Sequence, residues 1–180
     1  MGLRTALYED HVKLGANIVD FAGWELPVQY TKVIEEHEAT RERAGLFDIG
    51  HMGEFEITGK DAFEYLQYIF TRELKDLTPG TAMYSTMLFP NGGTIDDLFV
   101  YRLEPEKFMV VVNAANIKKD WDWIAGHIGE RAVQMKDVSD STSKIDVQGP
   151  LSAKIMGKLT NSELPARFGF THGEVAGIKT

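Results

Sequence analysis

The strongest constraint on the fold is a pair of apolar, β-rich segments at residues 82–89 and 94–103, joined by Pro-Asn-Gly-Gly at residues 90–93. Asn-Gly between two such segments is typical of a tight β-hairpin, because these turn residues tolerate positive φ. A third run, residues 108–112, is apolar at every position and is expected to form a central strand. The sequence therefore predicts an antiparallel sheet built around this hairpin.

Segments with helical periodicity alternate with these strands. Residues 32–44 are expected to form a charged helix, and residues 117–128 an amphipathic helix. Residues 58–70 are expected to form a helix that Thr58 caps. Further elements are expected as follows: turns and extended structure in 1–31, strands at 54–58, 132–137 and 143–148, a helix from residue 149, and the start of a strand at 173–180. The order β-α-β-β-β-α-β-β-α predicts an α+β fold, a mixed or antiparallel sheet with helices packed on it.

The chain of 180 residues is long enough for one good core or two small lobes. We expect a single truncated domain over residues 1–180. It would hold an N-terminal extended and helical segment at 1–50, a ferredoxin-like βαβββαββ core at 51–148, and the start of a second subdomain at 149–180. A strand that begins near the last residues is unusual for a finished domain, which suggests truncation.

Composition excludes several classes of function. The chain has no cysteine, which removes disulfides, iron–sulfur clusters and cysteine nucleophiles, and its five histidines show no pairing at metal-ligand spacing, so no metal site is expected. Its net charge of −8 argues against a broad nucleic-acid interface. It has no phosphate-binding glycine loop, membrane-length apolar run or signal peptide, so we interpret the protein as cytoplasmic.

The candidate chemistry centres on Asp96 and Asp97, which interrupt an otherwise apolar strand. Adjacent strand residues point to opposite faces, so Asp97 is expected beside Phe99 and Tyr101, and Asp96 on the other face. A carboxylate on an apolar face needs a partner, and it can act as a fixed acceptor for an N–H-bearing ligand. Alternatively, one of the two caps the glycine turn, and at least one is expected to be structural.

Several other polar residues have both a functional and a structural interpretation. Tyr84 and Tyr101 suit a planar, nitrogen-rich ligand, although ordinary core tyrosines are more common. Asn113 and Asn116 are expected to cap a helix, with a ligand contact as the alternative. His51 is expected to be a satisfied structural group. Without any comparison to a family, the residue pattern thus indicates an α+β protein with an acidic pair near two tyrosines.

Several stretches together resemble one family, the glycine cleavage T-proteins, in that family's order along nearly the whole chain. They are Leu7-Tyr8-Glu9 with His11, Val19-Asp20-Phe21-Ala22-Gly23-Trp24-Glu25-Leu26-Pro27 with Gln29-Tyr30, Ile34-Glu35-Glu36-His37, Ala44-Gly45-Leu46-Phe47-Asp48 with His51-Met52-Gly53-Glu54, Gly92-Gly93-Thr94-Ile95-Asp96-Asp97-Leu98, Val111-Val112-Asn113-Ala114-Ala115-Asn116 and Gln148-Gly149-Pro150. The resemblance implies the first half of the T-protein folate-binding domain.

The resemblance also implies an activity. Such a transferase takes the aminomethyl group from the lipoyl arm of H-protein, passes the one-carbon unit to tetrahydrofolate, and releases ammonia. The catalytic acid of the family aligns with Asp97, which would hold and orient the folate. The folate contacts implied by the match are Met52, Tyr84, Asp97, Phe99, Tyr101, Val111 and Asn113.

The chain departs from the family pattern in places. Gly50 replaces the usual Ser, and Arg72-Glu73 replaces Asn-Asp. The family continues beyond residue 180 into a region with further folate-binding residues, so a second chain or a homo-oligomer is expected to complete the fold. The alternative function is a non-catalytic folate-binding or scaffold homologue. Folate-dependent demethylases and sarcosine-type oxidases share the fold, and the T-protein pattern argues against them.

Overall fold

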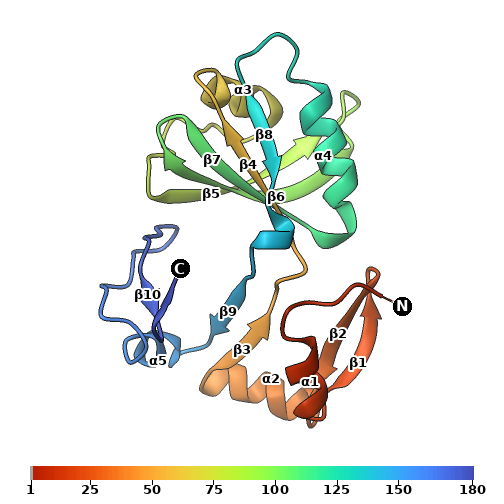
Figure 1. The fold of residues 1–180 in the computed structure, drawn as a ribbon, viewed down its shortest axis with the longest axis vertical. Helices are drawn as coiled ribbons and strands as arrows, with labels where there is room; N and C mark the ends of the chain where they lie inside the picture. Colours follow the sequence, from red (N-terminus) through yellow and green to blue (C-terminus); the bar gives the residue numbers. More distant parts are fainter. Residues whose placement is uncertain (1) are drawn as a thin grey trace. The chain divides into compact units, whose positions relative to one another are not determined.

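The computed structural model describes residues 2–180 and shows an α+β protein, as the sequence predicts (Figure 1). Contacts divide the chain into two compact units. The first comprises the chain up to His51 together with Ser143–Leu164 and His172–Thr180; the second comprises Met52–Thr142 and Pro165–Thr171. The division into domains expected from the sequence stays a prediction.

The second unit is built on a five-stranded antiparallel sheet with the order β5-β6-β7-β4-β8. The strands are β4 (Gly53–Thr58), β5 (Thr81–Leu88), β6 (Thr94–Glu104), β7 (Lys107–Val112) and β8 (Gln134–Asp137). The predicted hairpin is confirmed as β5–β6. In its turn the Phe89 N–H donates to the Gly93 carbonyl, and the Gly92 N–H donates to the Phe89 carbonyl. β7 occupies the centre of the sheet, which explains why its sequence is apolar on both faces.

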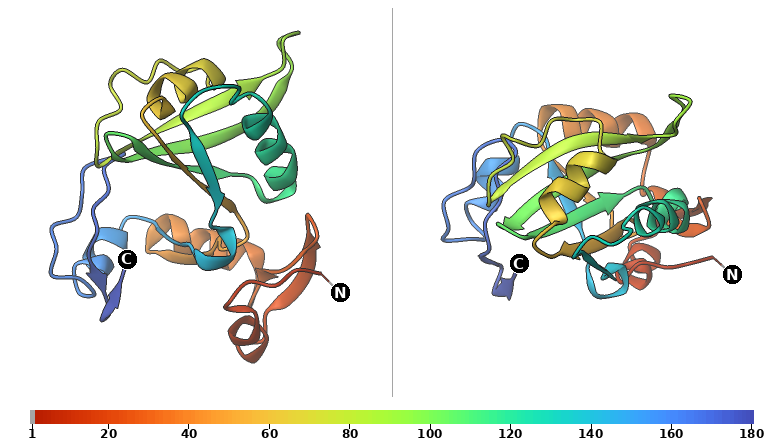
Figure 2. Two further views of the ribbon diagram at one scale, coloured as in Figure 1. Left: turned by 45° about the horizontal axis from the view of Figure 1, so that its top comes forward. Right: turned by 90° about the horizontal axis from the view of Figure 1, so that it is seen from above.

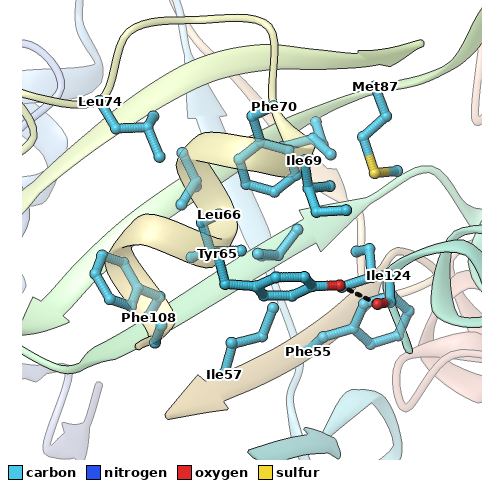
Figure 3. Close-up of a cluster of buried hydrophobic side chains, with 14 of the residues drawn as sticks. Phe55, Ile57, Tyr65, Leu66, Ile69, Phe70, Leu74, Met87, Phe108 and Ile124 are labelled. Carbon is cyan, nitrogen blue, oxygen red and sulfur yellow. Dashed lines mark hydrogen bonds between the residues drawn. The ribbon is translucent and has the colours of Figure 1, made fainter. Parts of the chain in front are cut away.

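Two helices, α3 (Ala62–Ile69) and α4 (Ile117–Gly126), cover one face of this sheet (Figure 2). Their apolar positions recur with helical spacing, so each helix buries one stripe against the strands. Tyr65 and Leu66 of α3, Ile124 of α4 and Phe55 of β4 are all fully buried in the resulting core. The Tyr65 hydroxyl donates a hydrogen bond to the Ile124 carbonyl, which satisfies the polar end of this side chain (Figure 3).

Because side chains alternate along a strand, the face of the sheet away from the helices carries a second set of side chains. On β6, Leu98 and Val100 point into the core, whereas Asp97, Phe99 and Tyr101 are only partly buried. This division follows the sequence prediction for the two acids. The face away from the helices therefore carries the polar and aromatic side chains that the sequence singles out.

Within residues 2–180, the first unit contains short elements and three two-stranded antiparallel sheets. Its elements are α1 (Tyr8–Lys13), β1 (Asn17–Phe21), β2 (Trp24–Gln29), α2 (Val33–Glu42), β3 (Gly45–Asp48), β9 (Ile145–Gln148), α5 (Ser152–Met156), β10 (Glu174–Val175) and β11 (Ile178–Lys179). The sheets pair β1 with β2, β3 with β9, and β10 with β11. Large apolar side chains such as Leu46 remain exposed on these strands.

Some local predictions were wrong. Thr58 does not cap α3, because it is the last residue of β4 and pairs with Lys107; the helix begins at Ala62. Residues 8–13 form a helix instead of extended structure. Residues 173–180 form the hairpin β10–β11 instead of one strand, because Ala176 and Gly177 adopt positive φ and reverse the chain.

Among residues 2–180, no helix combines the length and the apolar character needed to cross a lipid bilayer.

Candidate folate site and family membership

The candidate site lies where β5 and β6 run side by side in the second unit. Asp97 of β6 pairs with Thr86, and Phe99 pairs with Tyr84. The Tyr84 hydroxyl donates a hydrogen bond to the Asp97 carboxylate. This diagonal contact spans two residues along the ladder, a distance that an aromatic side chain can bridge. Tyr84 is 42% exposed, so the bonded pair faces solvent.

Asn113, which follows β7, holds the same carboxylate from the other side. Its amide nitrogen donates to Asp97 Oδ1 and to the Asp97 main-chain oxygen, both at 3.0 Å. It also lies 3.0 Å from Asp96 Oδ1. Because all three neighbours are acceptors, the amide nitrogen and not its oxygen must face them. The Asp97 carboxylate therefore has a fixed direction, with Asn113 on one oxygen and Tyr84 on the other.

The capping role expected for Asn113 and Asn116 was wrong. They occupy N-cap positions of η1 (Ala114–Asn116) and of α4, yet neither side chain makes a capping hydrogen bond. Asn116 instead donates to Asp96 Oδ1 at 2.8 Å. Hydrogen bonds from an amide N–H to a carboxylate are charge-assisted and stronger than neutral ones, so both asparagine side chains orient toward β6 instead of the helix termini.

Asp96 occupies the opposite, buried side of β6, where it is 5% exposed. It does not cap the glycine turn, which is closed instead by Asn91, whose side chain accepts from the Gly93 N–H. Burial alone would raise the pKa of Asp96, but hydrogen bonds from Asp120, Asn113 and Asn116 lower it below the ordinary value. Asp96 is thus an internal carboxylate.

An aromatic surface extends from Asp97 along the sheet. The Phe99 ring lies 5.1 Å from Tyr84 and 6.2 Å from Tyr101, measured between ring centroids. Two further rings join it from the segment Pro165–Thr171: Phe168 lies 6.4 Å from Phe99, and Phe170 lies 5.6 Å from Tyr101. The sequence analysis missed these two. The sequence does contain a signal for them: Phe168 and Phe170 alternate with Gly169, as in an extended segment that lies along a strand edge.

The other residues implied by the family match lie near this surface. Val111 of β7 pairs directly with Phe99 and is 3% exposed. Met52 precedes Gly53, which pairs with Val112 immediately before Asn113. The structure thus gathers Tyr84, Asp97, Phe99, Tyr101 and Val111 on one face of the sheet. Met52 and Asn113 flank its central strands; ligand contact by any of them stays a prediction.

This arrangement combines two chemical capacities. A carboxylate held by donors on both oxygens keeps lone pairs available for a further N–H group, and it can orient such a ligand without moving. The rings beside it offer faces and edges to a flat heterocycle. Among residues 2–180, no cluster of three or more His, Asp or Glu side chains is placed to hold a metal ion.

A second buried polar network lies in the first unit and explains the unexpected helix α1. The Tyr30 hydroxyl donates to His11 Nδ1 at 2.7 Å, and His11 Nε2 donates to Asp48 Oδ2 at 2.9 Å. Thr5 donates to the same carboxylate oxygen at 2.5 Å. Burial alone would raise the pKa of Asp48, but the Thr5 and His11 hydrogen bonds bring it below the ordinary value. These contacts tie α1 to β3.

His51 differs from the satisfied structural group expected from the sequence. Its Nδ1 atom is buried and makes no hydrogen bond within residues 2–180. Its ring stands edge-on to Phe21 and Trp24, with centroids 5.8 and 6.4 Å away. Burial accordingly lowers the pKa of His51.

Comparison with known proteins identifies the family. The model of the GCVT N-terminal domain matches residues 7–180. An aminomethyltransferase of Anoxybacillus flavithermus is 45% identical over 98% of this chain and 49% of its own length, and one from Bacillus pumilus is 46% identical over 93% and 46%. The chain thus spans about half the length of the curated relatives it matches.

A solved structure supports the same assignment. The glycine cleavage system aminomethyltransferase T of Bartonella henselae superposes with a TM-score of 0.83 at 34% identity, covering 91% of this chain and 44% of the other. The resemblance drawn from the sequence is therefore confirmed, as is the fold class. The chain belongs to the glycine cleavage T-protein (aminomethyltransferase) family and corresponds to its N-terminal portion.

Proposed function

We propose that this chain supplies the folate-binding face of an aminomethyltransferase of the glycine cleavage system. The reaction moves a one-carbon unit from aminomethyl-lipoyl H-protein to tetrahydrofolate and releases ammonia. Relatives named aminomethyltransferase, at about 45% identity, support the reaction class. The observation that carries the proposal is the Asp97 carboxylate, fixed by Tyr84 and Asn113 at the end of an aromatic surface.

Asp97 is the proposed catalytic residue. Its carboxylate would accept a hydrogen bond from a ring N–H of the reduced pterin and so hold the neighbouring nitrogen toward the incoming carbon. Because Tyr84 and Asn113 already fix the carboxylate, little reorganisation is needed when the ligand arrives. The contribution of Asp97 is orientation and electrostatic stabilisation, without a covalent bond to the protein.

The remaining family-matched residues would form the walls of the site. Phe99, Tyr101 and Tyr84 present rings to the pterin, and Met52 and Val111 supply apolar contact. Asn113 would act mainly through Asp97, to which it already donates. The proposed location is the cytoplasm. Because the relatives are about twice as long, we assign turnover to this chain together with the part that corresponds to the relatives' C-terminal half.

Calorimetric titration with tetrahydrofolate tests the binding step. We expect saturable binding by the wild-type chain and a loss of at least about tenfold in affinity for Asp97→Asn, which keeps the shape and removes the charge. Asp122→Asn is the matched control, since Asp122 is an exposed acid on α4 paired with Lys118. Equal affinity of Asp97→Asn and wild type would remove Asp97 from the site, and no binding by wild type would contradict the proposal for this chain.

Turnover separates the enzyme from the alternative, a folate-binding homologue without activity. The assay uses aminomethyl-loaded H-protein, tetrahydrofolate and the C-terminal half of the Anoxybacillus relative as the companion chain. Release of ammonia that Asp97→Asn reduces by about 100-fold or more would support the transferase. Folate binding without ammonia release would favour the non-catalytic homologue.

A further inference from the structure

A third acid, Asp120, lies behind the candidate site, where it contacts Asp96. It is in the first turn of α4 and is 0% exposed. Within residues 2–180, neither of its carboxyl oxygens receives a hydrogen bond from an N–H or hydroxyl donor. A fully buried acid without such donors is rare, because an isolated charge cannot be left in the core.

The group that Asp120 does meet is the carboxyl of Asp96 on β6, which is within hydrogen-bonding range. Two ionised carboxylates have no hydrogen to share and repel each other. The contact is attractive only when one of the two is a carboxylic acid that donates to the other. The pair therefore holds one proton between two buried acids.

The donors around the pair decide which residue carries this proton. Asp96 accepts N–H groups from the Asn113 backbone at 3.3 Å, from the Asn113 amide at 3.0 Å and from Asn116 at 2.8 Å, all of which favour the ionised form. Asp120 has no such donor. Asp96 is thus the carboxylate and Asp120 the acid.

The surrounding charges agree with this assignment. Burial, followed by the hydrogen bond and the negative charge of Asp96, raises the pKa of Asp120 to about 8. Asp97, also on β6, acts in the same direction. Lys119 on α4 opposes them, but its ammonium group bonds to the Ile95 carbonyl at 2.5 Å instead of to Asp120.

We propose that Asp120 is a positioning residue, which donates its proton to Asp96 and thereby fixes the Asn113 amide that holds Asp97. Each link is a hydrogen bond of one buried network: Asp120 to Asp96, Asn113 to Asp96, and Asn113 to Asp97. Loss of the proton places two negative charges side by side in the core and pushes Asp96 away from Asp120. Asn113 then shifts, and the Asp97 carboxylate loses its fixed direction. Only the final link, from Asp97 to ligand affinity, rests on the proposed folate function.

Carboxyl ¹³C NMR of the ligand-free wild-type chain tests the protonation and the coupling together. We expect the Asp120 carboxyl to titrate near pH 8, and the Asn113 side-chain amide and the Asp97 carboxyl to shift in the same titration. Asp120→Asn, a neutral isostere, should abolish this step, and Asp122→Asn should leave it unchanged. An Asp120 carboxyl that titrates near pH 4, the ordinary range for Asp, overturns the proposal. The proposal is also overturned if the chemical shifts of Asn113 and Asp97 do not change while Asp120 titrates.

Tetrahydrofolate affinity measured against pH tests the consequence for the site. Asp120 is fully protonated at pH values well below its pKa and loses the proton as the pH rises above it. Wild-type affinity should therefore fall as the pH rises through 8, by no more than the loss measured for Asp97→Asn, while Asp120→Asn stays level over the same range. Parallel pH profiles for the two proteins would refute a positioning role. A wild-type chain that binds no tetrahydrofolate would contradict the proposed function, and the NMR titration would still decide the role of Asp120.

Discussion

Asp96 and Asp97 are neighbours in sequence but occupy opposite environments. Asp96 lies in the interior among Asn113, Asn116 and Asp120, whereas Asp97 faces the aromatic surface and Tyr84. Strand alternation produces this separation, and it was predictable from the apolar pattern of β6. The asparagine partners were not, because a residue that follows a strand and precedes a helix usually caps the helix.

Asp96→Asn should act mainly on stability. The substitution removes the charge that two asparagine amides and Asp120 share, so we expect a loss of about 1 to 3 kcal/mol in the free energy of unfolding. A thermal melt beside Asp122→Asn measures the effect, since Asp122 is an exposed acid on α4 that pairs with Lys118. An unchanged melting temperature would contradict this structural role, and lost folate binding in such a stable variant would place Asp96 in the binding site, either directly or through Asn113 and Asp97.

At the level of elements, the sequence predicted the sheet of the second unit better than the short elements of the first. β5, β6, β7 and α4 carry long, regular patterns with one clear buried face, and they were predicted close to their observed bounds. Helix α1 has six residues and depends on contacts made by His11 with Asp48 and Tyr30. Such a helix is held by residues distant in sequence, so local periodicity cannot reveal it.

The turn between β4 and α3 should tolerate no side chain at Gly59. This residue has φ of +130°, and an added Cβ would lie 2.0 Å from the Ala132 carbonyl oxygen. We expect Gly59→Ala to lower the free energy of unfolding by more than about 3 kcal/mol, because strain and a backbone clash add together. Gly92→Ala is the control: φ is +85° with open space around the Cβ, so the cost should be about 1 to 2 kcal/mol. Equal denaturation midpoints for the two variants would contradict this.

At the level of the whole molecule, the two units differ in how completely they bury apolar surface. The second has a continuous core of fully buried side chains. In the first, β3 and β9 pair only with each other within residues 2–180, and Leu46, Phe47 and Ile145 on them are 69%, 43% and 51% exposed. Unpaired strand edges that carry exposed apolar side chains favour association with other strands.

The isolated chain should therefore self-associate at micromolar concentration. Leu46→Lys places a charge on the exposed strand β3 and should shift sedimentation toward monomer. Tyr68→Lys is the control, because Tyr68 is 64% exposed but lies on a helix, α3, which offers no unpaired strand edge. A strictly monomeric wild-type profile would contradict the prediction, as would an equal effect of the two variants.

The route of the chain has a consequence for synthesis. The segment Pro165–Thr171 returns to the second unit and lies along β5, where Ala82 donates to the Phe168 carbonyl and Phe170 to the Gly80 carbonyl. This contact closes a long loop, the chain between β5 and Pro165–Thr171. Closing a long loop costs more conformational entropy than forming contacts between residues that are close in sequence. A ribosome must also release this segment before Phe168 and Phe170 can join the aromatic surface. The sheet can thus form while the chain is still being made, and its aromatic surface is the last part of the unit to be completed.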